Sequence, residues 1–294
     1  MKIEKVGVVG CGLMGSGIAQ VTAVAGLPTK VLEVSQDLLD KGLASINRSL
    51  SKLVEKGELT DQQKSQAVAR LQPTLSLADF ADCDLVIEAI VENLERKRQL
   101  FSELDRLVKP EAILGSNTSS IPITELILAT RRPARVLGLH FFNPVPLMKL
   151  VEVVKTVVTD PEVVQLALDF ARLLGKTPIL TTDRAGFIVN RLLIPYLLDA
   201  VRAFQEGCGS LEDIDQGMKL GCNHPMGPFT LMDFIGIDTT YFIAEVLFNE
   251  YRETRFAPPP LLKRMFLAGM HGRKAGKGFY DYTDPKKPQV NKLL

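Results

Sequence analysis

The feature that most constrains how this chain can fold is a glycine-rich segment near its N-terminus, KVGVVGCGLMGSGIAQ at residues 5–20. Valines within residues 6–9 predict a buried strand, and a helical pattern follows. Between them, Gly10 permits a tight turn, Gly12 lets a ligand approach the backbone, and Gly15 lets the helix pack on the strand. The unpaired N–H groups of the first helical turn favour an anion. We therefore predict a dinucleotide pyrophosphate site with contacts from Gly10, Gly12, Leu13, Met14 and Gly15.

A second predicted strand, TKVLEV at residues 29–34, contains an acidic residue at the spacing that such a site requires. Glu33 follows the glycine turn by about 20 residues, where a carboxylate can bind the adenosine ribose diol. The same carboxylate would repel a ribose 2′-phosphate, so the sequence favours NAD over NADP. The alternative is that Glu33 only ends a strand at the protein surface.

Length, charge and cysteine content exclude several classes of protein. With 294 residues, two domains are expected, and a net charge of +1 gives no overall attraction to nucleic acid or to an anionic membrane. The four cysteines have no metal-finger spacing, which predicts free thiols in a reducing compartment. The first strand begins by about Lys5, and no run of 18 apolar residues occurs, so neither a signal peptide nor a membrane span is expected. A cytoplasmic location follows as an expectation.

The order of predicted elements divides the chain into two parts. Strands and helices alternate in the first part, which predicts an α/β, Rossmann-type, doubly wound and mostly parallel sheet. The second part is predicted to be an all-helical domain with a frayed tail from residue 284. The expected domains are residues 1–183 for NAD binding and residues 184–294 for substrate binding and dimerisation. Strands are expected near residues 84–89, 112–115, 135–141 and 149–154, and helices near residues 36–57, 60–71, 92–108, 161–174, 187–206, 211–220, 228–251 and 260–270.

One histidine stands where catalysis is expected. His140 lies near the end of a predicted strand, and ligands of open α/β sheets gather at the carboxyl ends of strands. Glu152 lies on the next predicted strand, which could return antiparallel and place its carboxylate against the imidazole. An imidazole held in this way is a general base suited to accept an alcohol proton during hydride transfer. The other two histidines, His224 and His271, are expected in loops, and no histidine pair has metal-ligand spacing, so no metal site is predicted.

Seven motifs, taken in their order along the chain, resemble those of the short-chain L-3-hydroxyacyl-CoA dehydrogenase family, which includes bacterial 3-hydroxybutyryl-CoA dehydrogenases. Their number makes the resemblance far more specific than any single motif. They are GCGLMGSGIAQ (10–20), VIEAIVEN (86–93), SNTSS (116–120), GLHFFNPVPLMKLVEV (138–153), GFIVNRLL (186–193), MGPFTLMDFIGID (226–238) and GRKAGKGFY (272–280).

The resemblance implies roles for further residues. The family's histidine–glutamate pair falls on His140 and Glu152, and its serine and asparagine at the substrate 3-oxygen fall on Ser119 and Asn190. Lys274 would come from the helical domain and implies closure over the nicotinamide. Many members carry Asp where this chain has Glu33, and the longer glutamate side chain is expected to serve the ribose diol as well. Besides the glycine turn, the implied cofactor contacts are Glu33, Glu92, Lys97, Ser119, Asn143 and Lys274.

A basic helix face is the candidate for binding coenzyme A. Ser49, Lys52 and Lys56 are spaced i, i+3 and i+7 on a predicted helix, with Arg48 beside them, so they share one face. The resemblance places Ser49, Lys56 and Ser119 at the CoA part of the substrate. For Lys52 and Arg48, a role at the CoA phosphates and a merely solvated helix face are equally open.

These observations predict an NAD-dependent dehydrogenase that reversibly oxidises (S)-3-hydroxyacyl-CoA, with a short acyl chain such as 3-hydroxybutyryl-CoA, to 3-oxoacyl-CoA. By family analogy a homodimer is expected, with an acyl-CoA thioester as the substrate and no nucleic-acid or membrane partner. Two alternatives stay open at this point. One is a dehydrogenase of a free 3-hydroxy acid or sugar acid, and the other is a non-catalytic NAD-binding structural protein.

Overall fold

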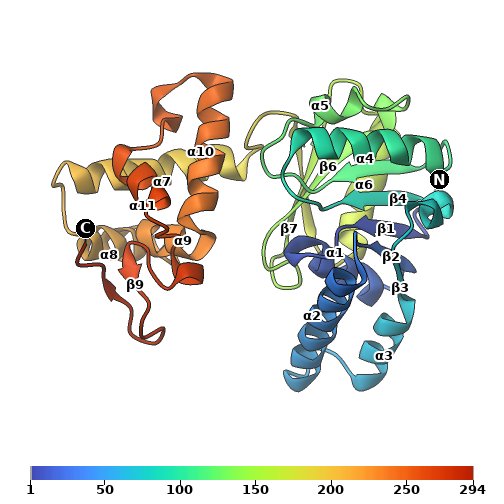
Figure 1. The fold of residues 1–294 in the computed structure, drawn as a ribbon, viewed down its shortest axis with the longest axis horizontal. Coiled ribbons are helices and arrows are strands. Elements are labelled where there is room, and N and C mark those ends of the chain that lie inside the picture. The colour runs from blue at the N-terminus through green and yellow to red at the C-terminus, as the bar shows by residue number, and fades with distance from the viewer. Residues whose placement is uncertain (1, 294) are drawn as a thin grey trace. The chain divides into compact units, whose positions relative to one another are not determined.

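The computed structural model describes residues 2–293, which form two compact units. Residues up to Phe187 belong to the first unit, and residues from Ile188 onward belong to the second. The sequence placed the boundary after residue 183, four residues before this division. Figure 1 shows the first unit as a sheet with helices around it and the second as a group of helices.

The first unit is built on an eight-stranded sheet in the order β3-β2-β1-β4-β5-β6-β7-β8. Neighbouring strands run parallel except β6 and β7, which are antiparallel. Strands β1 to β6 therefore share one edge at their carboxyl ends. The strands are β1 (Val6–Val9), β2 (Thr29–Leu32), β3 (Leu71–Thr74), β4 (Leu85–Glu88), β5 (Ile113–Ser116), β6 (Val136–Phe141), β7 (Leu150–Lys155) and β8 (Thr177–Thr182).

Six helices accompany this sheet, and α2 and α3 extend together beyond it (Figure 1). Ser35 and Thr60 begin these two helices, and each side chain accepts a hydrogen bond from a backbone N–H of the first turn. The helices are α1 (Leu13–Val24), α2 (Gln36–Glu55), α3 (Asp61–Arg70), α4 (Leu94–Leu107), α5 (Ile123–Ile127) and α6 (Pro161–Leu173).

Alternating side chains of the strands enter two hydrophobic clusters. Val8 and Ile87 pack with residues of α1 and α6, whereas Val9 and Val86 pack with residues of α4 and α5. Because successive side chains of a strand point to opposite faces, both faces of the sheet must be covered by helices. Fully buried strands read as continuous apolar runs, which explains why β4 was predictable from the sequence.

The second unit consists of helices joined to one short β-hairpin. Its helices are α7 (Val189–Gln205), α8 (Leu211–Gly221), α9 (Pro228–Ile235), α10 (Ile237–Tyr251) and α11 (Pro260–Leu267), and its strands are β9 (Tyr280–Asp281) and β10 (Gln289–Val290). The helical character of this part is confirmed. The hairpin is an addition that the prediction of an all-helical domain missed, because two-residue strands leave no periodic signal.

The single helix predicted at residues 228–251 is wrong, because the structure has two helices there. Gly236 separates α9 from α10 and has a φ of +105°, a backbone conformation that L side chains rarely adopt. The apolar pattern continues through the break because both helices bury residues around it. Periodicity alone therefore could not reveal the division.

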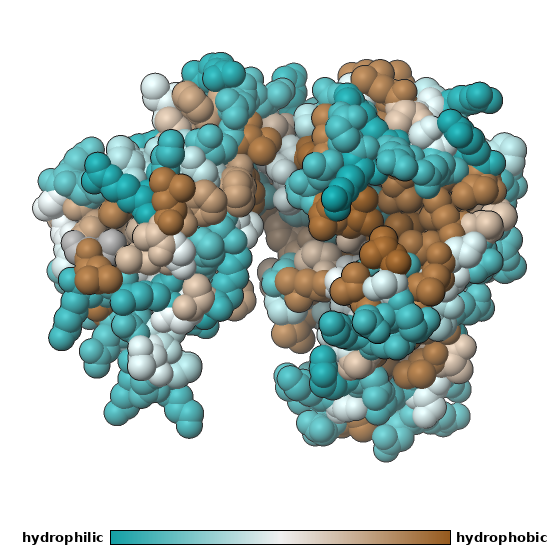
Figure 2. Space-filling model, in the orientation of Figure 1, coloured by the Kyte–Doolittle hydropathy of each residue, from teal (hydrophilic) through white to brown (hydrophobic). Residues whose placement is uncertain are grey.

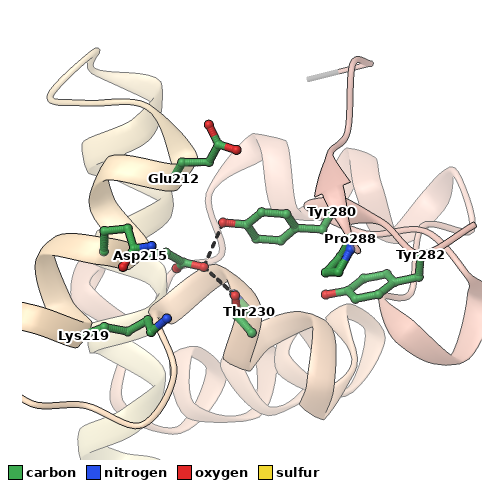
Figure 3. Close-up of a pocket in the computed structure, with 8 residues that line it drawn as sticks. Glu212, Asp215, Lys219, Thr230, Tyr280, Tyr282 and Pro288 are labelled. Atoms are coloured by element: carbon green, nitrogen blue, oxygen red, sulfur yellow. Dashed lines mark hydrogen bonds between the residues drawn. The ribbon is translucent and has the colours of Figure 1, made fainter. Parts of the chain in front are cut away.

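The prediction of a frayed tail from residue 284 is also wrong for the described residues, which end at 293; Leu294 lies outside them. Residues 289–290 pair with residues 280–281, and the Asn291 side chain is buried and donates a 2.8 Å hydrogen bond to the carbonyl of Gly278. Figure 3 shows how the hairpin is held: the Tyr280 hydroxyl donates to Asp215 of α8, at 2.9 Å. The same carboxylate accepts the backbone N–H of Phe229 at the start of α9, at 2.8 Å. Asp215 thus joins α8, α9 and the hairpin.

The surface is mixed in polarity. The face drawn in Figure 2 shows hydrophilic and hydrophobic residues interspersed on both units. Within residues 2–293, no helix combines the length and the apolar character needed to cross a membrane.

Candidate active site

The glycine turn between β1 and α1 is shaped by close backbone contacts. Gly10 has a φ of +95°, and a Cβ added at Gly15 would lie 1.8 Å from the Gly10 carbonyl oxygen. Gly10 therefore requires glycine for its backbone conformation, and at Gly15 any larger residue would separate the helix from the strand. A Cβ added at Gly12 would meet no atom within 4 Å. Gly12 thus faces open space at the N-terminus of α1, which is the cradle that a dinucleotide pyrophosphate needs.

The carboxylate of Glu33 lies against this turn. Its Oε1 accepts the backbone N–H of Cys11 at 2.6 Å, and its Oε2 accepts the N–H of Val34 at 3.1 Å. Glu33 is partly exposed just after β2, beside the turn that was predicted to hold the pyrophosphate. Its role at the ribose diol stays a prediction. Burial, with a smaller contribution from Glu33, raises the pKa of the Cys11 thiol to about 12, so this cysteine is an inert packing residue.

A buried carboxylate that the sequence analysis did not single out ends β4. Glu88 is 0 % exposed and lies in register with Val9 of β1 and Ser116 of β5, at the carboxyl ends of three parallel strands. The Lys97 ammonium of α4, also buried, lies 2.6 Å from its Oε1. The Ser116 hydroxyl donates to its Oε2 at 2.6 Å, and the backbone N–H of Ile90 donates to Oε1 at 2.8 Å. Every oxygen of this buried charge is therefore satisfied.

The SNTSS segment after β5 is held by a second carboxylate, Glu92. Its Oε1 accepts hydrogen bonds from the Thr118 hydroxyl, the Ser119 backbone N–H at 3.2 Å and the Ser120 hydroxyl at 3.0 Å. Its Oε2 lies 3.0 Å from the Lys97 ammonium. Burial would raise the pKa of Glu92, but Lys97 and these hydroxyl donors together lower it. The predicted cofactor residues Glu92, Lys97 and Ser119 thus belong to one connected network.

The proposed base and its carboxylate face each other across two antiparallel strands. His140 of β6 is paired in register with Glu152 of β7, and Nδ1 of the imidazole lies 2.7 Å from Oε2 of the carboxylate. Glu152 is 0 % exposed, and His140 is also buried. The rings of Phe142 and Phe187 lie 4.5 Å and 5.6 Å from the imidazole. A carboxylate can only accept a hydrogen bond, so the proton of the neutral imidazole is on Nδ1. Nε2 is then the nitrogen that can accept a proton from a substrate.

The turn between these two strands is tied down by a lysine that the sequence analysis overlooked. The Lys176 ammonium donates to the carbonyl oxygens of Val145 at 2.5 Å and Met148 at 2.8 Å. Burial lowers the pKa of Lys176. Asn143, a predicted cofactor contact, is exposed at the start of this turn, and Asn117 of the SNTSS segment accepts the N–H of Phe141 at 2.9 Å. The turn, the SNTSS segment and His140 are therefore held at one edge of the sheet.

Two predicted site residues belong to the second unit. Asn190 is buried in the first turn of α7. The Lys274 ammonium lies 2.7 Å from Asp238 of α10. The segment that carries Lys274 is anchored by the buried carboxylate of Asp233, which accepts the backbone N–H groups of Phe279 at 2.9 Å and Tyr280 at 2.8 Å. Burial raises the pKa of Asp233 to about 6.

The expected CoA face is partly formed by α2. Ser49 is partly buried, whereas Arg48 and Lys52 are exposed. Lys56 is also exposed, but α2 ends at Glu55, so Lys56 is the residue just beyond the helix. The remaining histidines have local partners: His224 lies 3.3 Å from the Tyr196 hydroxyl, and His271 lies 3.1 Å from the carbonyl of Phe266. Among residues 2–293, no group of His, Cys, Asp or Glu side chains is arranged to hold a metal ion.

Comparison with known proteins identifies the family. Residues 5–184 match the NAD binding domain of 3-hydroxyacyl-CoA dehydrogenase, and residues 186–282 match its C-terminal domain. The chain belongs to the 3-hydroxyacyl-CoA dehydrogenase family. A 3-hydroxybutyryl-CoA dehydrogenase of Mycobacterium tuberculosis is 48% identical over 282 residues, covering 95% of this chain and 99% of the relative.

Another relative, from Deinococcus radiodurans, carries the name "Probable 3-hydroxybutyryl-CoA dehydrogenase" and is 51% identical over 278 residues, covering 95% of this chain and 100% of its own length. The crystal structure of (S)-3-hydroxybutyryl-CoA dehydrogenase from Ralstonia eutropha has a TM-score of 0.93 to this fold at 42% identity, covering 96% of this chain and 100% of that one. Family membership confirms the predicted fold class, the NAD cofactor and the assignment as an NAD-dependent dehydrogenase. The roles of individual site residues stay predictions.

Proposed function

We propose that this protein catalyses the reversible, NAD-dependent oxidation of short-chain (S)-3-hydroxyacyl-CoA thioesters, such as (S)-3-hydroxybutyryl-CoA, to 3-oxoacyl-CoA. The observation that carries the proposal is the His140–Glu152 pair, at 2.7 Å, at the same sheet edge as the glycine turn. Ligands of parallel α/β sheets bind at that edge. The relatives named for this reaction support the choice of substrate.

His140 is proposed as the general base. With Nδ1 held by Glu152, Nε2 accepts the proton of the 3-hydroxyl group as the C3–O bond gains carbonyl character. The Glu152 carboxylate stabilises the positive charge that the imidazole acquires. When NAD is bound, it supplies the acceptor for the hydride that leaves C3. In the reverse direction the imidazolium returns its proton to the 3-oxygen.

Further residues are proposed to bind and orient the substrate and the cofactor. Ser119, fixed through its backbone N–H to Glu92, is proposed to donate to the 3-oxygen. Asn190 is proposed to donate to the same oxygen, which would polarise the developing carbonyl. Glu33 is proposed to accept hydrogen bonds from the ribose diol. The cofactor contacts of Asn143 and Lys274 rest on the family resemblance alone.

For coenzyme A, we propose that Ser49 and Lys56 bind the nucleotide part of the thioester, with Lys52 as a further cation. The exposed ammonium groups on and just beyond α2 support this assignment, because CoA phosphates are anionic. A homodimer is also proposed. Exposed apolar side chains of the second unit, Phe234 and Phe242, offer apolar surface for a contact between subunits. Sedimentation velocity would test the dimer.

The deciding experiment compares substrates. Initial rates of NADH oxidation are measured with 3-oxoacyl-CoA thioesters from four carbons upward, and with free acetoacetate and a 3-oxo sugar acid as controls. We expect the highest kcat/KM for a short thioester and little turnover of the free acids. Equal turnover of acetoacetate and acetoacetyl-CoA would overturn the CoA assignment, and NADH binding without any turnover would favour a non-catalytic NAD-binding protein.

A further inference from the structure

The imidazole of His140 has packing partners as well as a hydrogen-bond partner. Its Nδ1 lies 2.7 Å from Glu152 Oε2. A hydrogen bond at one ring nitrogen leaves the ring free to swing about that contact, so packing must fix the direction in which Nε2 points. Two aromatic rings lie against the imidazole: the centroid of Phe142 is 4.5 Å away and that of Phe187 is 5.6 Å away, at interplanar angles of 52° and 56°. Both distances are typical of favourable ring pairs.

Phe187 reaches this place through an unusual backbone conformation. Three residues other than glycine have a positive φ within residues 2–293: Phe187 at +47°, Asn223 and Arg252. Asn223 and Arg252 are exposed, and Arg252 caps the end of α10. Phe187 is only 3% exposed, and its bulky side chain makes this conformation costly, whereas glycine or asparagine would adopt it more easily. Such a conformation persists only where the surrounding structure holds it.

The segment that leads to Phe187 is anchored to two elements of the first unit. The backbone N–H of Asp183 donates to the carbonyl of Lys155, at the end of β7, at 2.9 Å. The Asp183 carboxylate accepts the backbone N–H of Ile123, at the start of α5, at 2.8 Å. The Phe187 N–H then closes a tight turn on the carbonyl of Arg184 at 2.8 Å. These contacts hold the costly conformation in place, and β7 is the strand that carries the carboxylate of the histidine–glutamate pair.

We infer that Phe187 is a positioning residue for His140: its ring restricts the imidazole to the orientation in which Nδ1 meets Glu152 and Nε2 is presented to the substrate. Phe142 contributes the other ring, but it belongs to the turn after β6 and is half-buried, so Phe187 is the better enclosed of the two. The inference deepens the proposed function, because it rests on His140 as the base.

The test makes the same substitution at two buried phenylalanines. Phe187→Leu keeps an apolar side chain but removes the aromatic ring from the imidazole. Phe80→Leu is the matched control: Phe80 is 0% exposed and belongs to the same hydrophobic cluster, but it precedes β4 and packs beside Gly7 of β1. Both substitutions should lower the melting temperature, because each leaves a smaller side chain in the core. A difference between the two variants at the active site therefore reports on His140 and not on core packing in general.

The first readout needs no turnover. The chain has three histidines, so a protein labelled with isotopes only at histidine gives few imidazole C–H signals in NMR spectra, and His140→Gln identifies the signal of His140. An aromatic ring displaces the NMR signals of protons near its face or edge. We expect Phe187→Leu to shift the His140 signal of the NADH-free protein and to leave those of His224 and His271 in place. Phe80→Leu should shift none of the three.

The second readout is the initial rate of NAD reduction with saturating (S)-3-hydroxybutyryl-CoA. We expect Phe187→Leu to lower kcat by about three- to tenfold, the scale of one aromatic pair, and to change the NADH dissociation constant by less than about twofold. Phe80→Leu should keep kcat within about twofold of the wild type, because it lies away from the reacting groups. A fall in kcat without loss of cofactor binding is the result expected from a misdirected base.

Three results would overturn the inference: an unmoved His140 signal in Phe187→Leu, a kcat of this variant within about twofold of the wild type, or an equal fall in kcat in Phe80→Leu. If Phe187→Leu does not fold, Phe187→Met repeats both measurements with a side chain that adapts better to irregular space. If neither variant folds, Phe187 serves the fold and not the base, and the inference is rejected. The proposed function fails by a different result, wild-type turnover in His140→Gln, and the NMR readout can still be interpreted in that case.

Discussion

Replacing Glu152 by Gln should show how much of the reaction depends on charge at the His140–Glu152 pair. The Gln side chain has nearly the same shape, and its amide oxygen can accept a hydrogen bond from the Nδ1–H group of His140. The 2.7 Å hydrogen bond to Glu152 therefore has a neutral replacement. What disappears is the negative charge that stabilises the imidazolium. The charge of an imidazolium is spread over the ring, which places its centre roughly 4 Å from the carboxylate. At an effective dielectric constant of about 20, that attraction is about 4 kcal/mol.

This energy corresponds to a fall in kcat of up to about a thousandfold, since about 1.4 kcal/mol equals a factor of ten. The assay is the reduction of NAD, followed at 340 nm, with saturating (S)-3-hydroxybutyryl-CoA, because the imidazolium forms in this direction. It is accompanied by the NADH dissociation constant and the melting temperature, both of which should stay near the wild-type values. A kcat of Glu152→Gln within about fivefold of the wild type would refute the reasoning, because a charge of this size could not then contribute to the barrier.

The double variant extends the same experiment. His140→Gln should lower kcat by about 10² to 10⁴, the contribution of a typical general base. Because the two residues act as one unit, the combined loss should be far smaller than the product of the single losses. In the oxidation direction, the acidic limb of the pH–rate profile should vanish in His140→Gln. Clean multiplication of the two effects would mean that His140 and Glu152 act independently.

Three further outcomes are expected. Glu33→Ala should lower the preference for NADH over NADPH, measured as the ratio of the kcat/KM values, by about 10- to 100-fold, because hydrogen bonds to a charged group are lost. A wild-type enzyme that prefers NADPH would contradict the ribose assignment. Lys56→Ala should raise KM for acetoacetyl-CoA by only about two- to fivefold, because exposed ion pairs are weak. It should leave KM for a truncated pantetheine thioester unchanged. Equal effects on the two substrates would indicate that this face of α2 is only solvated. Burial raises the pKa of Asp233 to about 6, so the folded protein binds this proton more tightly than the unfolded chain does. Its contribution to the free energy of unfolding should therefore fall by about 3 kcal/mol as the pH rises from about 3 to about 7, and urea unfolding should show that Asp233→Asn lacks this decline.

Much of the first unit could be predicted from the sequence because its signals are local. Strands buried on both faces appear as continuous apolar runs, and the amphipathic helices between them repeat with helical period. The glycine turn could be predicted for the same reason, since Gly10 has a positive φ and a Cβ at Gly15 would collide with the Gly10 carbonyl five residues earlier. Even the pairing of His140 with Glu152 could be anticipated, because a short connection between two strands favours an antiparallel pair.

The Glu88–Lys97 pair was not predicted, although the sequence carries a trace of it. Lys97 shares one face of α4 with Phe101 and Leu104, where an apolar residue is expected, and Glu88 ends an otherwise apolar strand. Each anomaly is weak by itself, because charged residues at the ends of elements are common. Only the packing of α4 against the sheet brings the two charges together.

The fold class, the glycine turn and the histidine–glutamate pair could be predicted from the sequence alone. Each depends on residues that lie close together in the chain or on adjacent strands. The tertiary structure decided which charged groups are buried together, where α9 ends at Gly236, and that the C-terminal hairpin is held by Asp215. Those features depend on contacts between residues far apart in the chain. The sequence pattern carries little record of such contacts, because a buried ion pair or a capped helix becomes favourable only after the surrounding elements have excluded water.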